Sequence, residues 1–281
     1  MTFESDDDPA SFLKFLEGSA LVAPIEPEDD DIGGLDPASF LDVLGSKNLP
    51  RTLGVEGRSA LDAEKLRVAA ALFTQEGFTE PALFGVTDGK TIGTYVEHRF
   101  KDFLGQHFDF DPGNSALGID FPSIATDLKV TSLKQPQSSS PFTSTRQKIY
   151  GLGHNLLVLM YEKIDDRAAK TSALRFTDTI FIEARCTGDF FTTRGLRQLI
   201  ENHADEHHLV AFMRDADLLI DHDVESPPAQ EILKDLAREV LRNPPTQGYL
   251  TLCNALQWRL QYSYAIECAG LGQVDGVVRV R

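Results

Sequence analysis

The sequence predicts an α/β fold, and three observations lead to that prediction. Segments with apolar residues at helical spacing alternate with short runs of β-forming residues, which is typical of a sheet flanked by helices. Two of these runs, residues 156–163 and 177–184, are apolar enough to form buried strands. With 281 residues and a hydrophobic fraction of 42%, the chain can also bury a substantial core.

The helices expected before these strands carry clear apolar stripes. Over residues 60–76 the apolar positions recur every three to four residues, and Gly77 then gives a stop signal. A second helix is predicted over residues 91–108, with Glu97 at the edge of its apolar stripe. A short third helix is predicted over residues 146–152, directly ahead of the two strands.

More helices are expected after the strands. One is predicted over residues 192–203, and the next opens at Pro227 and Pro228 and ends before Pro244. A last helix is predicted over residues 249–268. The expected order is therefore helix, hairpin, helix, two strands and then helices, which describes an α/β core with helical additions.

A charged β-hairpin is predicted between the second and third helices, in the stretch GIDFPSIATDLKVTS at residues 118–132. Side chains alternate along a strand, so Asp127 and Lys129 project from the same face, and the turn at 123–125 can bring Asp120 opposite them. Two carboxylates so close repel each other unless a cation lies between them. A hard divalent cation such as Mg²⁺ suits that position, and the lysine can hold a water molecule or neutralise phosphate charge.

The spacing D-x6-D-x-K resembles the signature of the PD-(D/E)XK nuclease superfamily, which includes many type II restriction endonucleases. Over residues 88–190 the predicted order of elements is also similar to the core of that superfamily. Ile119 stands where the name of the motif has proline, a departure that leaves the chemistry intact. The resemblance implies a restriction-endonuclease-like core, a mixed central sheet flanked by helices, with helical N- and C-terminal additions.

The resemblance also implies roles for individual residues. Asp120 matches the first metal-binding aspartate, Asp127 the second acid and Lys129 the lysine, while Glu97 matches the helical glutamate of many members. Asp120, Asp127, the Leu128 carbonyl and Glu97 are then expected to bind one or two Mg²⁺ ions. The implied protein is a type II site-specific deoxyribonuclease that acts on double-stranded DNA as a homodimer, with a cognate DNA methyltransferase as its companion.

A polar segment, residues 133–148, follows the proposed catalytic strand and supports a nucleic-acid substrate. Gln can read adenine, Arg and Lys can read guanine or hold phosphate, and hydroxyl groups suit either task. The alternative is an ordinary polar surface loop. The residues expected to bind DNA are Lys134, Gln135, Gln137, Ser138, Ser139, Ser140, Thr143, Ser144, Arg146 and Lys148.

The charge of the chain is unevenly distributed. The formal net charge is −16, but residues 1–64 hold 15 acidic and 4 basic side chains, so the remaining residues carry only −5. A polyanionic partner is therefore not excluded. We expect an acidic arm with short helices over residues 1–60 and a nuclease domain over 61–281, whose core spans about 88–190 and whose helical part spans about 191–281. The arm could be a solvated tail, a DNA mimic or an oligomerisation element.

Three further features have plain structural explanations beside functional ones. Of His203, His207 and His208, the first two lie four residues apart and could clamp a metal, but an exposed helix end is favoured. The segment 186–195 could contact phosphate, although a helix-capping turn is favoured. Trp258 could stack on a base, and a core position is its default.

The cellular setting expected from the sequence is a reduced cytoplasm without membrane contact. The longest apolar run, residues 156–161, is far shorter than a membrane span, and the N-terminus lacks the features of a signal peptide. The three cysteines have no zinc or redox spacing.

Two other classes of function share the same predicted fold. One is a repair or recombination nuclease, and the other is a DNA-binding or protein-interaction module without catalysis. For the module, the charged residues of the hairpin would form only a buried ion-pair cluster. Buried charges rarely add stability, so an intact set of two aspartates and a lysine favours the nuclease.

Overall fold

A mixed five-stranded sheet forms the centre of the computed structural model, which describes residues 58–113, 118–139, 142–216, 227–253, 259–271 and 274–281. Its order is β10-β7-β6-β4, and β2 also pairs with β7. Strand β4 runs parallel to β6, whereas the other pairs are antiparallel. The strands are β2 (Phe78–Glu80), β4 (Thr126–Ser132), β6 (Asn155–Asp166), β7 (Thr171–Ile182) and β10 (Val277–Arg279).

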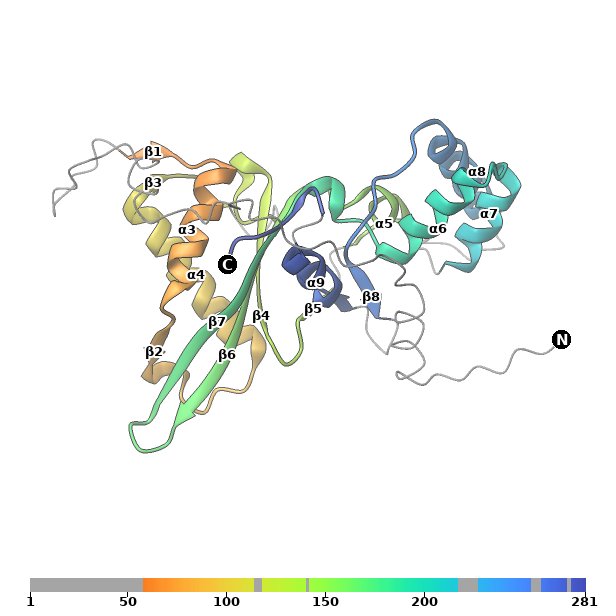
Figure 1. The fold of residues 1–281 in the computed structure, drawn as a ribbon. Helices are drawn as coiled ribbons and strands as arrows, with labels where there is room; N and C mark the ends of the chain where they lie inside the picture. The colour runs from red at the N-terminus through yellow and green to blue at the C-terminus, as the bar shows by residue number, and fades with distance from the viewer. Residues whose placement is uncertain (1–57, 114–117, 140–141, 217–226, 254–258, 272–273) are drawn as a thin grey trace, which may run out of the picture.

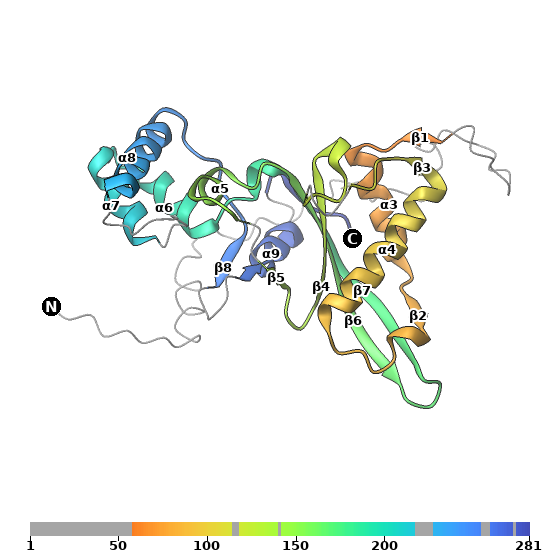
Figure 2. The ribbon, with the colours of Figure 1, turned by 180° about the vertical axis from the view of Figure 1, so that it is seen from behind.

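Helices cover both faces of this sheet (Figures 1 and 2). On one face, Leu157 and Leu159 of β6 pack with α3 (Ala63–Gln75) and α4 (Gly89–His107). The neighbouring β6 residue Val158 points to the other face, where α9 (Ser263–Leu271) packs. This alternation of buried residues confirms the prediction that the two central strands are buried on both sides. The predicted α/β class, with a mixed sheet between helices, is confirmed at this level.

The second predicted helix is α4, whose limits follow from its sequence. Asp88 caps the N-terminus by accepting hydrogen bonds from the backbone N–H groups of Lys90 and Thr91, which lack partners within the helix. The helix ends at His107. The predicted apolar stripe is the buried one and consists of Ile92, Val96, Phe100 and Leu104. Because this stripe fixes the rotation of α4, Glu97 and Lys101 lie at its border.

A helical bundle stands beside the sheet, at the other end of the molecule from α3 and α4 (Figure 1). Leu196, Leu209 and Leu233 lie at its centre and are fully buried. Its helices are α5 (Thr145–Tyr150), α6 (Phe190–Glu201), α7 (Glu206–Asp215) and α8 (Pro227–Arg242). The predicted helices in the regions of α5, α6 and α8 are confirmed.

A small antiparallel sheet links the bundle to the main sheet. It consists of β5 (Gln137–Ser139), β9 (Arg259–Gln261) and β8 (Thr251–Cys253), in the order β5-β9-β8. The helix predicted over residues 249–268 is therefore wrong at Thr251–Cys253 and Arg259–Gln261, and among the described residues of this range only those of α9 are helical. Strand β9 pairs with β5, which lies more than a hundred residues earlier, and local periodicity does not report such a partner.

The predicted charged hairpin is also only partly correct. Its second strand is β4, but residues 118–123 do not form an extended partner strand. Phe121 makes a single bridge to Thr126, and Pro122–Ile124 form the 3₁₀ turn η2. Proline lacks the N–H group that a strand ladder needs, and Ala125 closes the turn with a φ of 45°. The ladder of β4 is made with β6 instead.

Four other short elements complete the described fold: β1 (Ser59–Ala60), β3 (Phe108–Asp109) and the 3₁₀ turns η1 (Pro81–Leu83) and η3 (Ala184–Cys186). Most of the acidic arm, together with Ser140 and Trp258, lies outside the described residues. Within those residues, no helix combines the length and apolar character needed to cross a membrane.

Candidate active site

Strand β4 brings Asp127 and Lys129 together at the edge of the main sheet. Their side chains leave the same face of the strand, and Lys129 Nζ lies 2.6 Å from Asp127 Oδ2. Between them, Leu128 points the other way into the core shared with α4. Asp127 is 4% exposed, so its carboxylate has little contact with solvent.

The turn η2 returns Asp120 to the same place. Asp120 Oδ2 accepts a hydrogen bond from the backbone N–H of Leu128 at 3.0 Å. The carboxyl groups of Asp120 and Asp127 are also within hydrogen-bonding range of each other. The sequence prediction that these two aspartates converge is therefore met, although a turn rather than a strand carries Asp120.

Helix α4 supplies Glu97 and a lysine that the sequence prediction missed. Lys101 Nζ lies 2.8 Å from Glu97 Oε1 and 2.6 Å from Asp120 Oδ1. Glu97 thus reaches the aspartates through the Lys101 ammonium group. The spacing of Glu97 and Lys101, four residues apart on one helix, is the pattern of an intrahelical ion pair and could have been found in the sequence.

The two aspartates have opposite pKa shifts. Burial raises the pKa of Asp127 to about 6, and its hydrogen bond with Asp120 acts in the same direction, against the attraction of Lys129. For Asp120, burial acts to raise the pKa, but hydrogen bonds from Asp127, Lys101 and the Leu128 N–H group lower it below the ordinary value. The pair therefore holds one proton more readily than two ordinary aspartates would.

The donor atoms fit one hard divalent cation. Among the residues that the structure describes, no three His, Cys, Asp or Glu side chains gather closely enough to hold a metal by themselves. The paired oxygens of Asp120 and Asp127, followed on the strand by the Leu128 carbonyl, suit an ion that keeps several water ligands. A raised pKa on one of two adjacent carboxyl groups, here Asp127, is what such a pair shows when no cation separates them.

Histidine 154 lies near this cluster and was not predicted as a site residue. The positive charge of Lys129 contributes, after burial, to lowering the pKa of His154. Its Nε2 atom is buried without a hydrogen-bond partner among the described residues. No sequence motif points to this histidine, because it approaches the site through the pairing of β6 with β4.

The residues predicted to bind DNA fall into two groups. Several are tied into the fold: Ser144 caps α5, Arg146 pairs with Glu239, and Lys148 is buried with Nζ 2.9 Å from the Ala216 carbonyl oxygen. Lys134, Gln135, Ser139 and Thr143 are exposed, and Gln137 and Ser138 are half-buried. The segment is thus neither a simple loop nor wholly available, since it contains β5 and α5.

The weaker candidates from the sequence have structural explanations. His203 lies in the turn before α7 with a φ of 58°, so it does not share a helix with His207, and His208 Nδ1 is 2.7 Å from the Asp205 carboxylate. All three histidines are exposed. The segment 186–195 forms the expected capping turn, because Asp189 accepts a hydrogen bond from the Thr192 N–H group at 2.9 Å.

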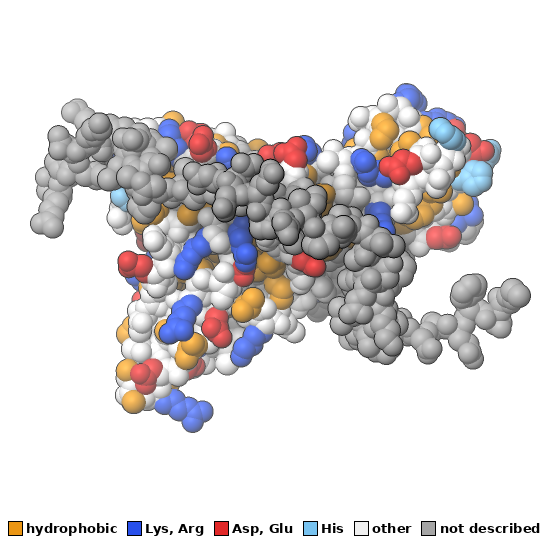
Figure 3. All heavy atoms as spheres, in the orientation of Figure 1, with side chains coloured by type: hydrophobic (Ala, Val, Ile, Leu, Met, Phe, Trp, Pro, Cys, Tyr) orange, Lys and Arg blue, Asp and Glu red, His pale blue; other side chains and the backbone are white. Residues whose placement is uncertain are grey.

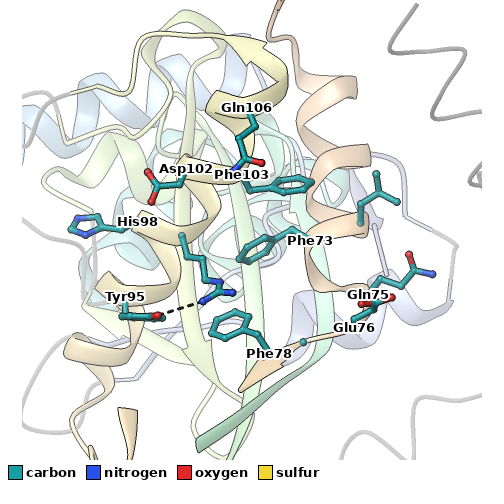
Figure 4. Close-up of a pocket in the computed structure, with 12 residues that line it drawn as sticks. Phe73, Gln75, Glu76, Phe78, Tyr95, His98, Asp102, Phe103 and Gln106 are labelled. Atoms are coloured by element: carbon teal, nitrogen blue, oxygen red, sulfur yellow. Dashed lines mark hydrogen bonds between the residues drawn. The ribbon is translucent and has the colours of Figure 1, made fainter. Parts of the chain in front are cut away.

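A hollow of about 690 Å³ lies between α3 and α4, away from the aspartates. Figure 4 shows Tyr95, His98 and Asp102 on the side of α4 that faces this hollow, and Arg99 donates a hydrogen bond to the Tyr95 hydroxyl. Neither Glu97 nor any residue of β4 lines it. We therefore do not assign the chemistry to this hollow.

The surface charge in the view of Figure 3 is mixed. Lys and Arg side chains lie among Asp and Glu over the part of this face that carries the main sheet. Affinity for DNA is therefore not supplied there by one continuous basic surface.

A family model agrees with the motif and covers most of the chain. The model of the type II restriction enzyme NspV matches residues 60–279. The chain belongs to the NspV family of type II restriction enzymes. A curated relative of the same name from Nostoc sp. (strain ATCC 29411 / PCC 7524) is 49% identical over 222 residues, which cover 78% of this chain and 96% of the relative. No solved structure matches the chain.

The region matched by the family model contains the whole cluster of charged residues. Glu97, Lys101, Asp120, Asp127 and Lys129 all lie inside the matched region, which begins at residue 60. The part of the chain in which the carboxylates meet is therefore part of the region shared with this family.

Proposed function

We propose that Asp120, Asp127 and Lys129 form the catalytic centre of this type II restriction enzyme and that Mg²⁺ is its metal ion. As a member of the NspV family, the chain is a site-specific DNA endonuclease. The observation that carries the proposal for the site is the convergence of three side chains: Asp120 Oδ2 accepts a hydrogen bond from the Leu128 N–H group beside Asp127, and Lys129 Nζ lies 2.6 Å from Asp127 Oδ2.

Each residue has a separate task in this proposal. Asp120, Asp127 and the Leu128 carbonyl would hold the ion, and Glu97 would complete the shell or hold a second ion. A divalent cation supplies compensation for the negative charge that develops on the phosphate in the transition state. Lys129 donates a hydrogen bond to the attacking water from Nζ and so orients its oxygen toward phosphorus. The water oxygen forms the new bond to phosphorus as the bond to the leaving sugar oxygen breaks.

The setting of the enzyme is part of the same proposal. A homodimer would match the two-fold symmetry of a palindromic duplex site. A cognate DNA methyltransferase would protect the DNA of the host, and both proteins would work in the cytoplasm. Of the predicted DNA contacts, Lys134, Gln135 and Ser139 are the exposed ones on the approach to β5 and along it.

Cleavage of plasmid and phage DNA in Mg²⁺ tests the proposal. Discrete and reproducible fragments are expected, whereas nicking or structure-dependent cutting would indicate a repair nuclease. Asp120→Ala should abolish cutting and Lys129→Ala should lower its rate at least about 100-fold, while the circular dichroism spectrum of each variant stays unchanged. Two residues that make no contact with Asp120, Asp127 or Lys129 provide the matched controls: variants of the exposed Asp102 (Asp102→Ala) and of the half-buried Lys65 (Lys65→Ala) should cut at the wild-type rate. Absence of cleavage by the wild type with every divalent metal tried would overturn the proposal.

A further inference from the structure

The small sheet β5-β9-β8 has one face in the core and one polar face. On the inner side, Leu260 is fully buried and Leu252 packs against the same cluster. Ser138 also points inward, because its Oγ lies 2.7 Å from the hydroxyl of the buried Tyr262. Side chains alternate along a strand, so the neighbours of these three residues point outward.

The outward positions carry a particular set of side chains. The register places Gln137 beside Gln261 and Gln261 beside Thr251, and in the next row it places Ser139 beside Arg259. These five residues include no carboxylate, although the chain has a formal net charge of −16. The side-chain amides of Gln137 and Gln261 have no hydrogen-bond partner among the described residues. The outward positions of these three short strands therefore carry two amides, a guanidinium group and two hydroxyls. Ser139 is exposed and the other four residues are half-buried.

This polar face is fixed relative to the proposed catalytic centre. Thr131 follows Lys129 by two positions on β4, so the two side chains leave the same face of the strand. Thr131 Oγ1 lies 3.1 Å from the backbone N and O atoms of Gln137 and donates to the Gln135 carbonyl at 3.0 Å. The Tyr262 hydroxyl under the sheet is also close enough to Asp127 for that carboxylate to affect it electrostatically. Rigid positioning of this kind is what base reading beside a cleavage site requires.

We propose that the outer face of β5-β9-β8 reads base edges in the major groove, with Arg259 contacting a guanine and Gln137 and Gln261 contacting an adenine. The proposal rests on the proposed function. The major groove admits a β-ribbon, in which outward side chains meet the bases. Arg fits the O6 and N7 acceptors of guanine, and a Gln amide fits N6 and N7 of adenine, each through two hydrogen bonds. Among these residues, Arg259 and Gln261 lie outside residues 133–148, the polar segment predicted to bind DNA.

A base-analogue experiment tests this assignment. The site is first mapped from wild-type fragments, and duplexes are then made in which 7-deazaguanine replaces guanine at one position at a time. For the wild type we expect kcat/KM to fall about 5-fold or more at one position, since one of two hydrogen bonds is lost. Arg259→Ala should lower kcat/KM on the unmodified duplex roughly 10- to 100-fold and should be insensitive to the analogue at that same position. Gln137→Ala and Gln261→Ala are tested in the same way with 7-deazaadenine.

Two controls keep the result interpretable. Arg242→Ala, at the exposed end of α8, makes the same charge change and should keep the wild-type response to every analogue. Arg259→Lys keeps the charge without the fork of donors, and should lose the guanine response even if Arg259→Ala folds poorly. The assignment of Arg259 is overturned if its variants still respond to every analogue as the wild type does, or if the mapped site has no G·C pair. The glutamine assignments fail if both variants keep the wild-type response to 7-deazaadenine. A wild type that does not cut overturns the proposed function instead.

Discussion

The Nζ atom of Lys101 lies 2.6 Å from Oδ1 of Asp120 and, on its other side, 2.8 Å from Oε1 of Glu97. An ammonium group therefore stands between two carboxylates that the nuclease resemblance assigns to metal binding. Burial acts to lower the pKa of Lys101, but the hydrogen bonds to Asp120 and Glu97 outweigh it and raise the pKa. Lys101 remains charged, and it compensates the carboxylates as a tethered cation.

The first prediction concerns this compensation. Lys101→Met should destabilise the metal-free protein by roughly 1–3 kcal/mol, because two partly buried acceptors lose a charged hydrogen-bond donor. The same variant should gain more thermal stability than the wild type when Mg²⁺ is added, since the ion then meets uncompensated carboxylates. Urea unfolding without metal and melting with increasing Mg²⁺ measure the two effects. Lys65→Met removes the surface pair of Lys65 with Asp62, and we expect it to change stability by less than about 1 kcal/mol.

The second prediction concerns the buried charge of Asp127. Its folded-state pKa of about 6 lies above the ordinary value of 3.8, so the folded protein keeps this proton to a higher pH than the unfolded chain does. Protonation of Asp127 therefore stabilises the folded protein fully below about pH 4, and this contribution is lost as the pH rises through about 6. At pH 7 the folded protein is then less stable, by up to about 3 kcal/mol, than it would be with Asp127 protonated. Asp127→Asn should therefore be inactive and yet more stable than the wild type without metal at pH 7.

Urea unfolding at pH 7.5 and pH 5 measures this effect. The advantage of Asp127→Asn over the wild type should shrink at the lower pH, whereas the exposed Asp102→Asn should show no comparable change. If Asp127→Asn is less stable than the wild type at both pH values, its pairing with Lys129 outweighs the burial of the charge, and the prediction is wrong.

The convergence of Asp120 and Asp127 could be predicted because it is local. Seven positions separate them, and strand alternation already groups Asp127 with Lys129. The backbone route between them was not predictable in the same way. Pro122 and the left-handed Ala125 make a 3₁₀ turn where apolar alternation favoured a strand.

The parts that the sequence did not reveal depend on distant partners. The parallel ladder of β4 with β6 brings His154 toward Lys129, and no local pattern encodes that pairing. The same holds for β9, whose residues alternate about the buried Leu260 and were read as helical. Tertiary pairing thus overrode a weak local preference in the region that we propose reads DNA.

The third prediction separates Glu97 from the aspartates. Glu97 is bound only through Lys101 in the described structure, so it should tune metal affinity without being essential. Glu97→Gln should raise the Mg²⁺ concentration for half-maximal cleavage by about 10-fold and lower the maximal rate less than Asp120→Ala does. Cleavage rates across a Mg²⁺ titration give both values. An unchanged Mg²⁺ dependence would remove Glu97 from the metal site.

The fourth prediction addresses the task of Lys129. If Lys129 orients the attacking water, its hydrogen bond matters in the transition state more than in the bound duplex. Lys129→Ala should then lower kcat at least about 100-fold, while KM for a duplex carrying the mapped site changes by less than about 3-fold. Lys129→Arg keeps the charge but presents a larger planar group, so it should recover little of the lost rate. A variant that loses DNA affinity and keeps kcat would instead make Lys129 a phosphate contact. The water would then need another partner, and His154, whose buried Nε2 atom has no hydrogen-bond partner among the described residues, is a candidate for that role.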